Sequence, residues 1–110
     1  MKQHWYFILL ALARTEQHGS GIMRDVLSLT NGELKLWPAT LYGSLEELRE
    51  QGWIEEVEDP AERPEGESQR KRIYRMSRAG RRAMAAETTR LERLVKLARA
   101  RVGPSRQEIG

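Results

Sequence analysis

A helix followed by a strand is encoded in residues 36–58, which read LWPATLYGSLEELREQGWIEEVE. Pro38 suits the first turn of a helix, because its missing N–H would have no partner there. Apolar residues then recur at helical spacing and predict a buried face made of Leu41, Leu45 and Leu48. Gly52 can take the left-handed conformation that stops a helix, and residues 53–58 are rich in β formers. The sequence therefore predicts a helix that starts at Pro38 and stops at Gly52, and a strand directly after it.

A returning strand and a long helix are predicted further along the chain. Residues 72–76, RIYRM, have the composition of a strand, and a polar loop with Pro60, Pro64 and Gly66 separates them from the first strand. Ser77 is a good helix N-cap. The helix that it opens runs from Arg78 to about Val102, where Gly103-Pro104 ends it.

Two shorter helices are predicted before residue 36. The first runs from Gln3 to Arg14 and has a core face made of Trp5, Ile8, Leu9 and Leu12. The second runs from Gly21 to Leu29, with Ser20 as its N-cap. Its buried residues are predicted to be Ile22, Val26 and Leu29. Asn31-Gly32 marks a turn after it.

The predicted fold class is mainly α (α+β). The order of three helices, a two-stranded hairpin and a last helix is that of a winged helix-turn-helix, in which the third helix is presented to the major groove and the hairpin flanks it. A chain of 110 residues has room for one small core. We expect residues 1–80 to form the winged helix-turn-helix domain, residues 81–103 a dimerisation helix, and residues 104–110 a flexible tail.

The composition argues against catalysis, metals and membranes. Cysteine is absent, which excludes disulfides, thiol catalysis and cysteine-ligated zinc, and His4 and His18 are too far apart in sequence for a zinc motif. Lys2 and the apolar run 5–13 resemble a short signal peptide, but the run is too short to span a bilayer and has a core face. We expect a cytoplasmic protein with no enzymatic activity, no cofactor, no metal and no membrane association.

Charge is segregated along the chain, although the net charge is only +3. Residues 51–68 carry seven acidic side chains and one basic one, whereas residues 69–110 carry thirteen basic and three acidic ones. A basic C-terminal third favours a polyanionic partner, and an arginine-rich solvated helix is the alternative.

Several motifs, in this order and at this spacing, resemble the PadR family of bacterial transcriptional regulators. They are His18-Gly19, LWPATLY at 36–42, Leu45 and Leu48 before Gly52-Trp53-Ile54, and RKRIYRMSRAG at 70–80. The resemblance covers roughly residues 5–85 and implies a homodimeric DNA-binding repressor whose last helix makes the dimer; many members respond to small aromatic or cationic effectors. The chain departs from the family pattern at Ser20, where a Tyr is usual, and at Gly43, where a Pro is common. An interior Gly loosens the helix.

The third helix and the hairpin supply the predicted DNA contacts. On the outward side of the helix these are Pro38, Ala39, Thr40, Tyr42, Gly43 and Ser44, with Lys35 as a phosphate contact just before it. Tyr42 either hydrogen-bonds a phosphate or is a half-buried packing residue. The acidic Glu46, Glu47 and Glu50 repel phosphates and confine contact to the first turn and a half. We therefore expect few contacts with base edges, and we expect sequence specificity to depend on DNA shape.

In the hairpin, Arg70, Lys71 and Arg72 form the densest basic cluster. Strand alternation places Arg70 and Arg72 on one face, where they are expected to contact phosphate or the minor groove. The alternative is a solvated strand end. Tyr74 is expected to pack, and the acidic loop 59–67 to point away from DNA.

The last helix carries apolar residues at heptad spacing, and we predict that it pairs with a second copy. The seam consists of Met84, Thr88, Leu91, Val95, Ala98 and Val102, widened by Leu94. The alternative is a core stripe within one chain. A small aromatic effector is predicted to bind where Trp5, Ile8 and Leu12 meet the partner's last helix; alternatively, Trp5 only fills the core.

These observations predict a dimeric winged-helix transcription regulator, acting as a repressor on an inverted repeat in double-stranded DNA. A winged-helix protein–protein interaction module, which uses its acidic wing instead of binding DNA, is the alternative.

Overall fold

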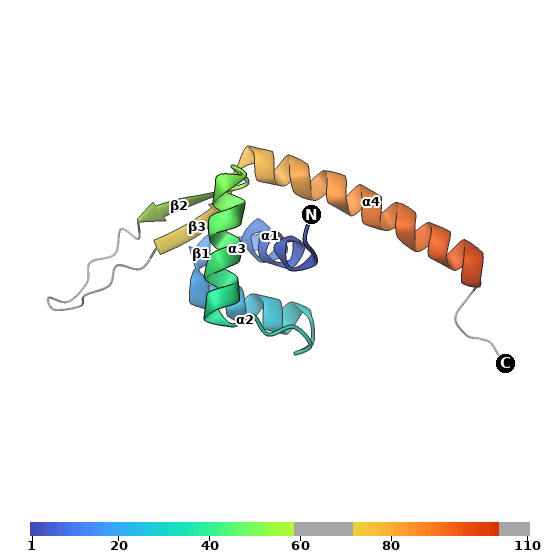
Figure 1. Cartoon of the computed structure of the whole chain (residues 1–110), viewed down its shortest axis with the longest axis horizontal. Coiled ribbons are helices and arrows are strands. Elements are labelled where there is room, and N and C mark those ends of the chain that lie inside the picture. The colour runs from blue at the N-terminus through green and yellow to red at the C-terminus, as the bar shows by residue number, and fades with distance from the viewer. Residues whose placement is uncertain (59–71, 104–110) are drawn as a thin grey trace, which may run out of the picture.

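Four helices and a three-stranded sheet make up the part of the chain that the structure describes, residues 1–58 and 72–103 (Figure 1). The structure is a computed structural model. In chain order the elements are α1 (Gln3–Arg14), β1 (Gln17–His18), α2 (Gly19–Leu29), α3 (Pro38–Glu50), β2 (Ile54–Glu58), β3 (Arg72–Met76) and α4 (Arg78–Val102). The predicted bounds of α1, β3 and α4 are confirmed. The whole is mostly helical with a small antiparallel sheet, as predicted for a winged helix.

The sheet has the strand order β1-β3-β2, and both pairings are antiparallel. Tyr74 is the central residue of β3, and it faces Gln17 of β1 on one side and Glu56 of β2 on the other. The strand β1 was not predicted. It has only two residues, and it exists because the free edge of β3 is available for pairing.

The core lies between α1, α2, α3 and the sheet. Its buried apolar residues are Trp5, Ile8, Leu9, Ala11, Leu12, Ile22, Val26, Leu36, Leu41, Leu45, Leu48, Ile54 and Tyr74. The predicted inner face of α3 is confirmed, since Leu41, Leu45 and Leu48 are each at most 2% exposed. The spacing of the leucines therefore determines which side of α3 is left for a partner.

The start and the buried face of α2 differ from the prediction. The helix begins at Gly19, and its N-cap is His18, so Ser20 lies inside the first turn and does not cap it. Leu29 is 49% exposed, because it lies at the end of the helix beyond the buried Ile22 and Val26. The turn at Asn31-Gly32 is confirmed, with φ of 54° and 83°.

The end of α3 and the start of α4 are joined through the residues between them. Gly52 has a φ of 79° and ends α3, as predicted. The Ser77 hydroxyl donates to the Gly52 carbonyl oxygen at 2.6 Å, and the Ser77 N–H donates to the Trp53 carbonyl at 3.0 Å. The same hydroxyl caps α4 by accepting from the Gly80 N–H at 3.0 Å. Gly80 is so close to Trp53 that a Cβ there would overlap the Trp53 carbonyl oxygen.

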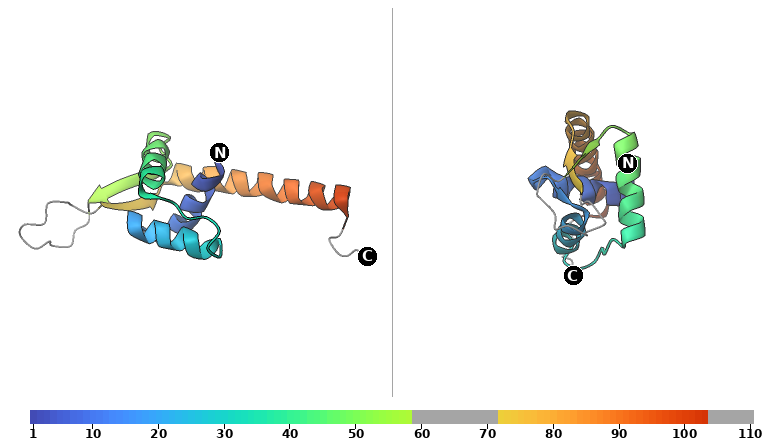
Figure 2. Two further views of the ribbon diagram at one scale, coloured as in Figure 1. Left: turned by 60° about the horizontal axis from the view of Figure 1, so that its bottom comes forward. Right: turned by 90° about the vertical axis from the view of Figure 1, so that its left-hand side faces the viewer.

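The helix α4 leaves the body of the fold as a long rod, and only its first turns rest on the other elements (Figure 1, Figure 2). The proposed division at residues 80 and 81 into a DNA-binding domain and a dimerisation helix stays a prediction, and the predicted tail at 104–110 lies outside the described residues. No helix in the described ranges is long and apolar enough to cross a membrane.

Candidate nucleic-acid interface

The first turns of α3 present a smooth, exposed surface. Pro38, Ala39, Thr40 and Gly43 are all exposed, and none has a side chain larger than a proline ring or a threonine. The N-cap residue Trp37 makes no side-chain hydrogen bond to the helix. The N–H groups of this first turn are therefore aimed outward at the positive end of the helix dipole, which suits them to a phosphate.

Ser44 does not belong to this surface. It is only 3% exposed, because it lies between Leu41, Leu45 and Leu48 on the inner side of α3. The prediction that Ser44 contacts DNA is wrong for this reason.

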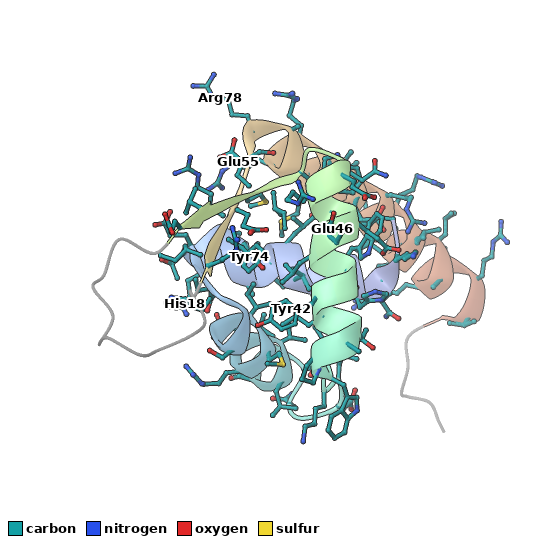
Figure 3. All side chains as sticks on the ribbon, turned by 60° about the vertical axis from the view of Figure 1, so that its left-hand side comes forward. His18, Tyr42, Glu46, Glu55, Tyr74 and Arg78 are labelled. Atoms are coloured by element: carbon teal, nitrogen blue, oxygen red, sulfur yellow. The ribbon has the colours of Figure 1, made fainter. Side chains whose placement is uncertain are left out.

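Tyr42 leans from α3 toward the start of α2 (Figure 3). Its ring lies against Gly19, where an added Cβ would be 2.5 Å from the phenolic oxygen. Nearly half of the side chain, 48%, is still exposed. The structure thus shows the packing role foreseen for Tyr42, and a contact with phosphate stays a prediction.

Two of the three glutamates of α3 have partners within the chain. Glu46 pairs with Arg49 at 2.5 Å, one turn further along the helix. Glu47 accepts from the Trp5 indole N–H and from Lys2, both at 3.2 Å, and so it faces α1. Glu47 therefore links α3 to α1.

The two basic residues in the described part of the wing, Arg72 and Arg75, are also paired. Arg72 is exposed, as predicted, but its guanidinium lies 2.6 Å from Glu56 on the neighbouring strand. Arg75 pairs with Glu55 in the same way, at 2.7 Å. The described part of the wing thus carries little net charge. Arg70 and Lys71 lie outside the described residues.

Tyr74 packs in the core, as expected, and lies to the side of α3, near Tyr42, in Figure 3. It is 7% exposed. Burial, reinforced by the negative charge of Glu56, raises the pKa of its phenol, so the ring stays neutral and packs as an apolar group.

A polar cluster holds α1, β1 and α2 together. Asp25 accepts from the Gln17 amide at 2.9 Å and from Arg14 at 3.0 Å. The Gln17 amide also donates to the Ala11 carbonyl at 3.1 Å. These hydrogen bonds, first from Gln17 and then from Arg14, lower the pKa of the Asp25 carboxyl below its usual 3.8.

The predicted seam of α4 divides into two parts. Met84 packs against the core, and the Tyr6 and Thr88 hydroxyls are hydrogen-bonded at 2.6 Å, so this first part contacts α1 of the same chain. Further out, Leu94, Val95 and Val102 are 39%, 50% and 81% exposed. An open groove of about 830 Å³ lies where the two parts meet. It is lined by Tyr6, Thr88, Thr89, Leu91, Glu92, Arg93, Val95 and Lys96.

The three residues predicted for an effector pocket do not line this groove. Ile8 is fully buried, Leu12 is 2% exposed and Trp5 is 8% exposed, all within the core of a single chain. Trp5 packs edge-to-face on Trp53 at 5.8 Å. They were predicted from one helix face; that face is covered by the chain's own α2, α3 and sheet, so it is not open to a partner's helix.

Sequence analysis missed two residues, one at the nucleic-acid interface and one in the groove. Trp37, directly before Pro38, is 62% exposed and lies beside Lys35. Tyr6 is half-buried and lines the groove. An aromatic residue at the N-cap, where Ser, Thr, Asp or Asn is usual, is the signal that could have identified Trp37.

Within the described ranges, no three His, Asp or Glu side chains gather as a metal site requires.

The fold of the chain is similar to that of several solved structures. It superposes on a transcriptional regulator from Clostridium thermocellum with a TM-score of 0.75 at 20% identity, covering 89% of this chain and 91% of that one. A PadR family regulator from Clostridium difficile gives a TM-score of 0.72 at 15% identity, with 90% and 97% covered. Bacillus subtilis PadR, in complex with operator DNA, gives 0.67 at 17% identity, with 79% and 47% covered.

At these identities the likeness establishes the fold. A search of curated protein sequences gives no match. The family model of the transcriptional regulator PadR-like family, in contrast, matches residues 8–86, which extend from α1 into α4 and include α3 and the wing. The chain belongs to the PadR-like family of transcriptional regulators.

Proposed function

We propose that this chain binds double-stranded DNA through the first turns of α3 and represses transcription as a homodimer on an inverted-repeat operator. The observation that carries the proposal is the exposed surface of Pro38, Ala39, Thr40 and Gly43, which combines small side chains with uncapped N–H groups. A related fold, that of B. subtilis PadR, is known in complex with operator DNA, and this supports the proposal.

The homodimer is part of the proposal because the outer half of α4 has no cover within the chain. Leu94, Val95 and Val102 expose apolar surface on a helix that also carries many arginines. Pairing with a second copy removes that surface from water and relates two α3 helices by a two-fold axis, as an inverted repeat requires.

The proposed effector site is the groove between α1 and α4. Its volume of about 830 Å³ falls in the range of small-molecule pockets, and Tyr6, Leu91 and Val95 supply aromatic and apolar walls. A small planar aromatic compound is the class of ligand that fits. A regulator with such a site is expected to work in the cytoplasm, beside the chromosome.

The alternative, a protein-interaction module that uses the acidic wing, has less support. The carboxylates of Glu55 and Glu56 are each paired with an arginine of β3. They therefore offer a basic partner little unbalanced negative charge.

DNA binding is tested by fluorescence anisotropy with DNA from upstream of the encoding gene and a scrambled duplex of equal length. At about 150 mM salt, we expect preference for the upstream DNA and a steep loss of affinity with added salt. Thr40→Glu places a negative charge on the α3 surface and is expected to abolish binding. Ala100→Glu places the same charge on the outer half of α4 and serves as the control. Equal, weak binding of both duplexes would contradict the proposal.

The effector site is tested by thermal melting with a panel of planar aromatic compounds. We expect at least one compound to raise the melting temperature of the wild-type chain, and a smaller increase in Tyr6→Ala, because the groove loses its aromatic wall. No increase across the panel would contradict this part of the proposal.

A further inference from the structure

Trp37 is the one tryptophan of the three that the core does not hold. Trp5 is 8% exposed and Trp53 is partly buried, and the two rings pack on each other. Trp37 is 62% exposed. An indole that is exposed to water adds little to the stability of the fold, because the stabilisation comes from burying its apolar surface. Its position therefore calls for a partner outside the chain.

Lys35 gives this exposed ring a positive charge. The Lys35 ammonium lies over the Trp37 ring, 4.4 Å from its centroid. This distance is well within the reach of a cation–π interaction. The pair is thus held together on the surface, with an apolar ring, an indole N–H donor and a cation side by side.

The pair lies at the end of α3 that the proposed function assigns to DNA. Trp37 is the N-cap of α3, and its indole has no acceptor with which to cap the helix. The uncapped N–H groups of Ala39 and Thr40 follow directly. The groups named here supply hydrogen-bond donors, a cation and an apolar face, and together these match the sugar–phosphate backbone of DNA.

We propose that Trp37 is a DNA contact, with its ring packed against the deoxyribose of one strand and Lys35 on an adjoining phosphate. This inference rests on the proposed function. The bases of a duplex are stacked, so an indole at the edge of the groove can reach a sugar without unstacking them. Trp37 would then fix the position of α3 along the groove and increase affinity for every sequence, while Lys35 contributes the salt-dependent part.

The two contacts can be separated by their salt dependence. Trp37→Ala is expected to weaken binding about tenfold without changing the slope of affinity against salt, because no charge is lost. Trp37→Phe keeps an aromatic ring and is expected to recover part of the affinity. Lys35→Gln is expected to lower the slope by about one for each copy bound. Arg78→Gln, which removes an exposed charge at the start of α4, outside both proposed sites, is the matched control.

The experiment uses the full chain and two probes, the upstream duplex and the scrambled duplex, with binding followed by anisotropy. Acrylamide quenching of tryptophan emission is measured in parallel. Because Trp37 is the most exposed of the three rings, we expect DNA to protect a quenchable fraction in the wild type, and no such fraction to be present in Trp37→Phe. Circular dichroism checks that each variant is folded.

The outcomes distinguish the two proposals. If the wild type binds DNA, Trp37→Ala binds equally well and emission stays quenchable in the complex, Trp37 is not a contact, although the proposed function stands. If the wild type binds neither duplex at any salt concentration, the proposed function fails and the assignment of Trp37 fails with it.

Discussion

The contact between Gly19 and Tyr42 determines how closely the start of α2 approaches α3. The phenol occupies the space where a Cβ would lie, so the glycine is needed for the absence of a side chain rather than for an unusual backbone. A pairing of this kind cannot be predicted from periodicity, because the two residues are 23 positions apart and only the fold brings them together. The same is true of Glu47 and Trp5.

Gly19→Ala is therefore expected to destabilise the fold by about 1–3 kcal/mol, through overpacking against Tyr42. In a Tyr42→Ala background the same change is expected to cost much less. Gly43→Ala is the matched control: nothing lies within 4 Å of the added Cβ, and a stabilisation of about 0.5–1 kcal/mol is expected from helix propensity. Urea unfolding measures all three. Equal destabilisation by Gly19→Ala in both backgrounds would contradict the steric explanation.

Asp25 is expected to make stability depend on pH at the acid end. Its pKa is lower in the folded chain than its usual 3.8, so the ionised form favours folding. This contribution is fully present above the unfolded value and is lost as the pH falls through the lower folded value. Melting temperatures measured from about pH 6 down to about pH 2 should fall less steeply for Asp25→Asn than for the wild type. Parallel curves would exclude the effect.

At the scale of elements, the helices were the predictable part. Leucine spacing identified the inner face of α3, and Ser77 and Gly103 gave the ends of α4, because these signals are local. The strand β1 was missed, since two residues have no period and depend on β3. The ion pair of Arg72 with Glu56 was missed because it connects two strands across a loop, and sequence analysis treated Arg72 as free to contact DNA.

The pairing of Arg72 with Glu56 predicts a variant that binds DNA more tightly. In Glu56→Gln the guanidinium loses its partner and a negative charge is removed beside α3, so both changes favour a nearby phosphate. We expect affinity to rise by about threefold to tenfold. Glu58→Gln, two residues further along β2, tests whether any loss of negative charge has the same effect. Anisotropy titrations with the upstream duplex give the comparison, and unchanged affinity in Glu56→Gln would place Arg72 away from the DNA.

At the scale of the whole molecule, the fold is a small core with one long helix attached to it. The family model ends at residue 86, and the outer half of α4 lies beyond it. The heptad spacing predicted an uncovered seam there, and the structure has exposed apolar side chains at Leu94, Val95 and Val102.

Leu94→Glu is expected to convert a dimer into monomers, because it places a charge in the seam. Ala100→Glu adds the same charge to the face of α4 that points away from the seam, and is expected to leave the dimer intact. Sedimentation equilibrium gives the mass of each variant. A wild type that sediments at 12.7 kDa at every concentration would contradict the dimer outright.

The joint at Ser77 has a mechanical consequence. The Ser77 hydroxyl hydrogen-bonds both the Gly52 carbonyl, just after α3, and the Gly80 N–H in the first turn of α4. Gly80 also packs directly against the Trp53 carbonyl, with no room for a side chain between them. A joint held in this way is expected to resist bending, so a change in the direction of α4 is expected to tilt α3 with it, and α4 would act as a lever. In a dimer joined through α4, a compound that altered the angle between the two α4 helices would change the distance between the two α3 helices. That distance would then no longer match the helical repeat of DNA, although neither subunit would unfold.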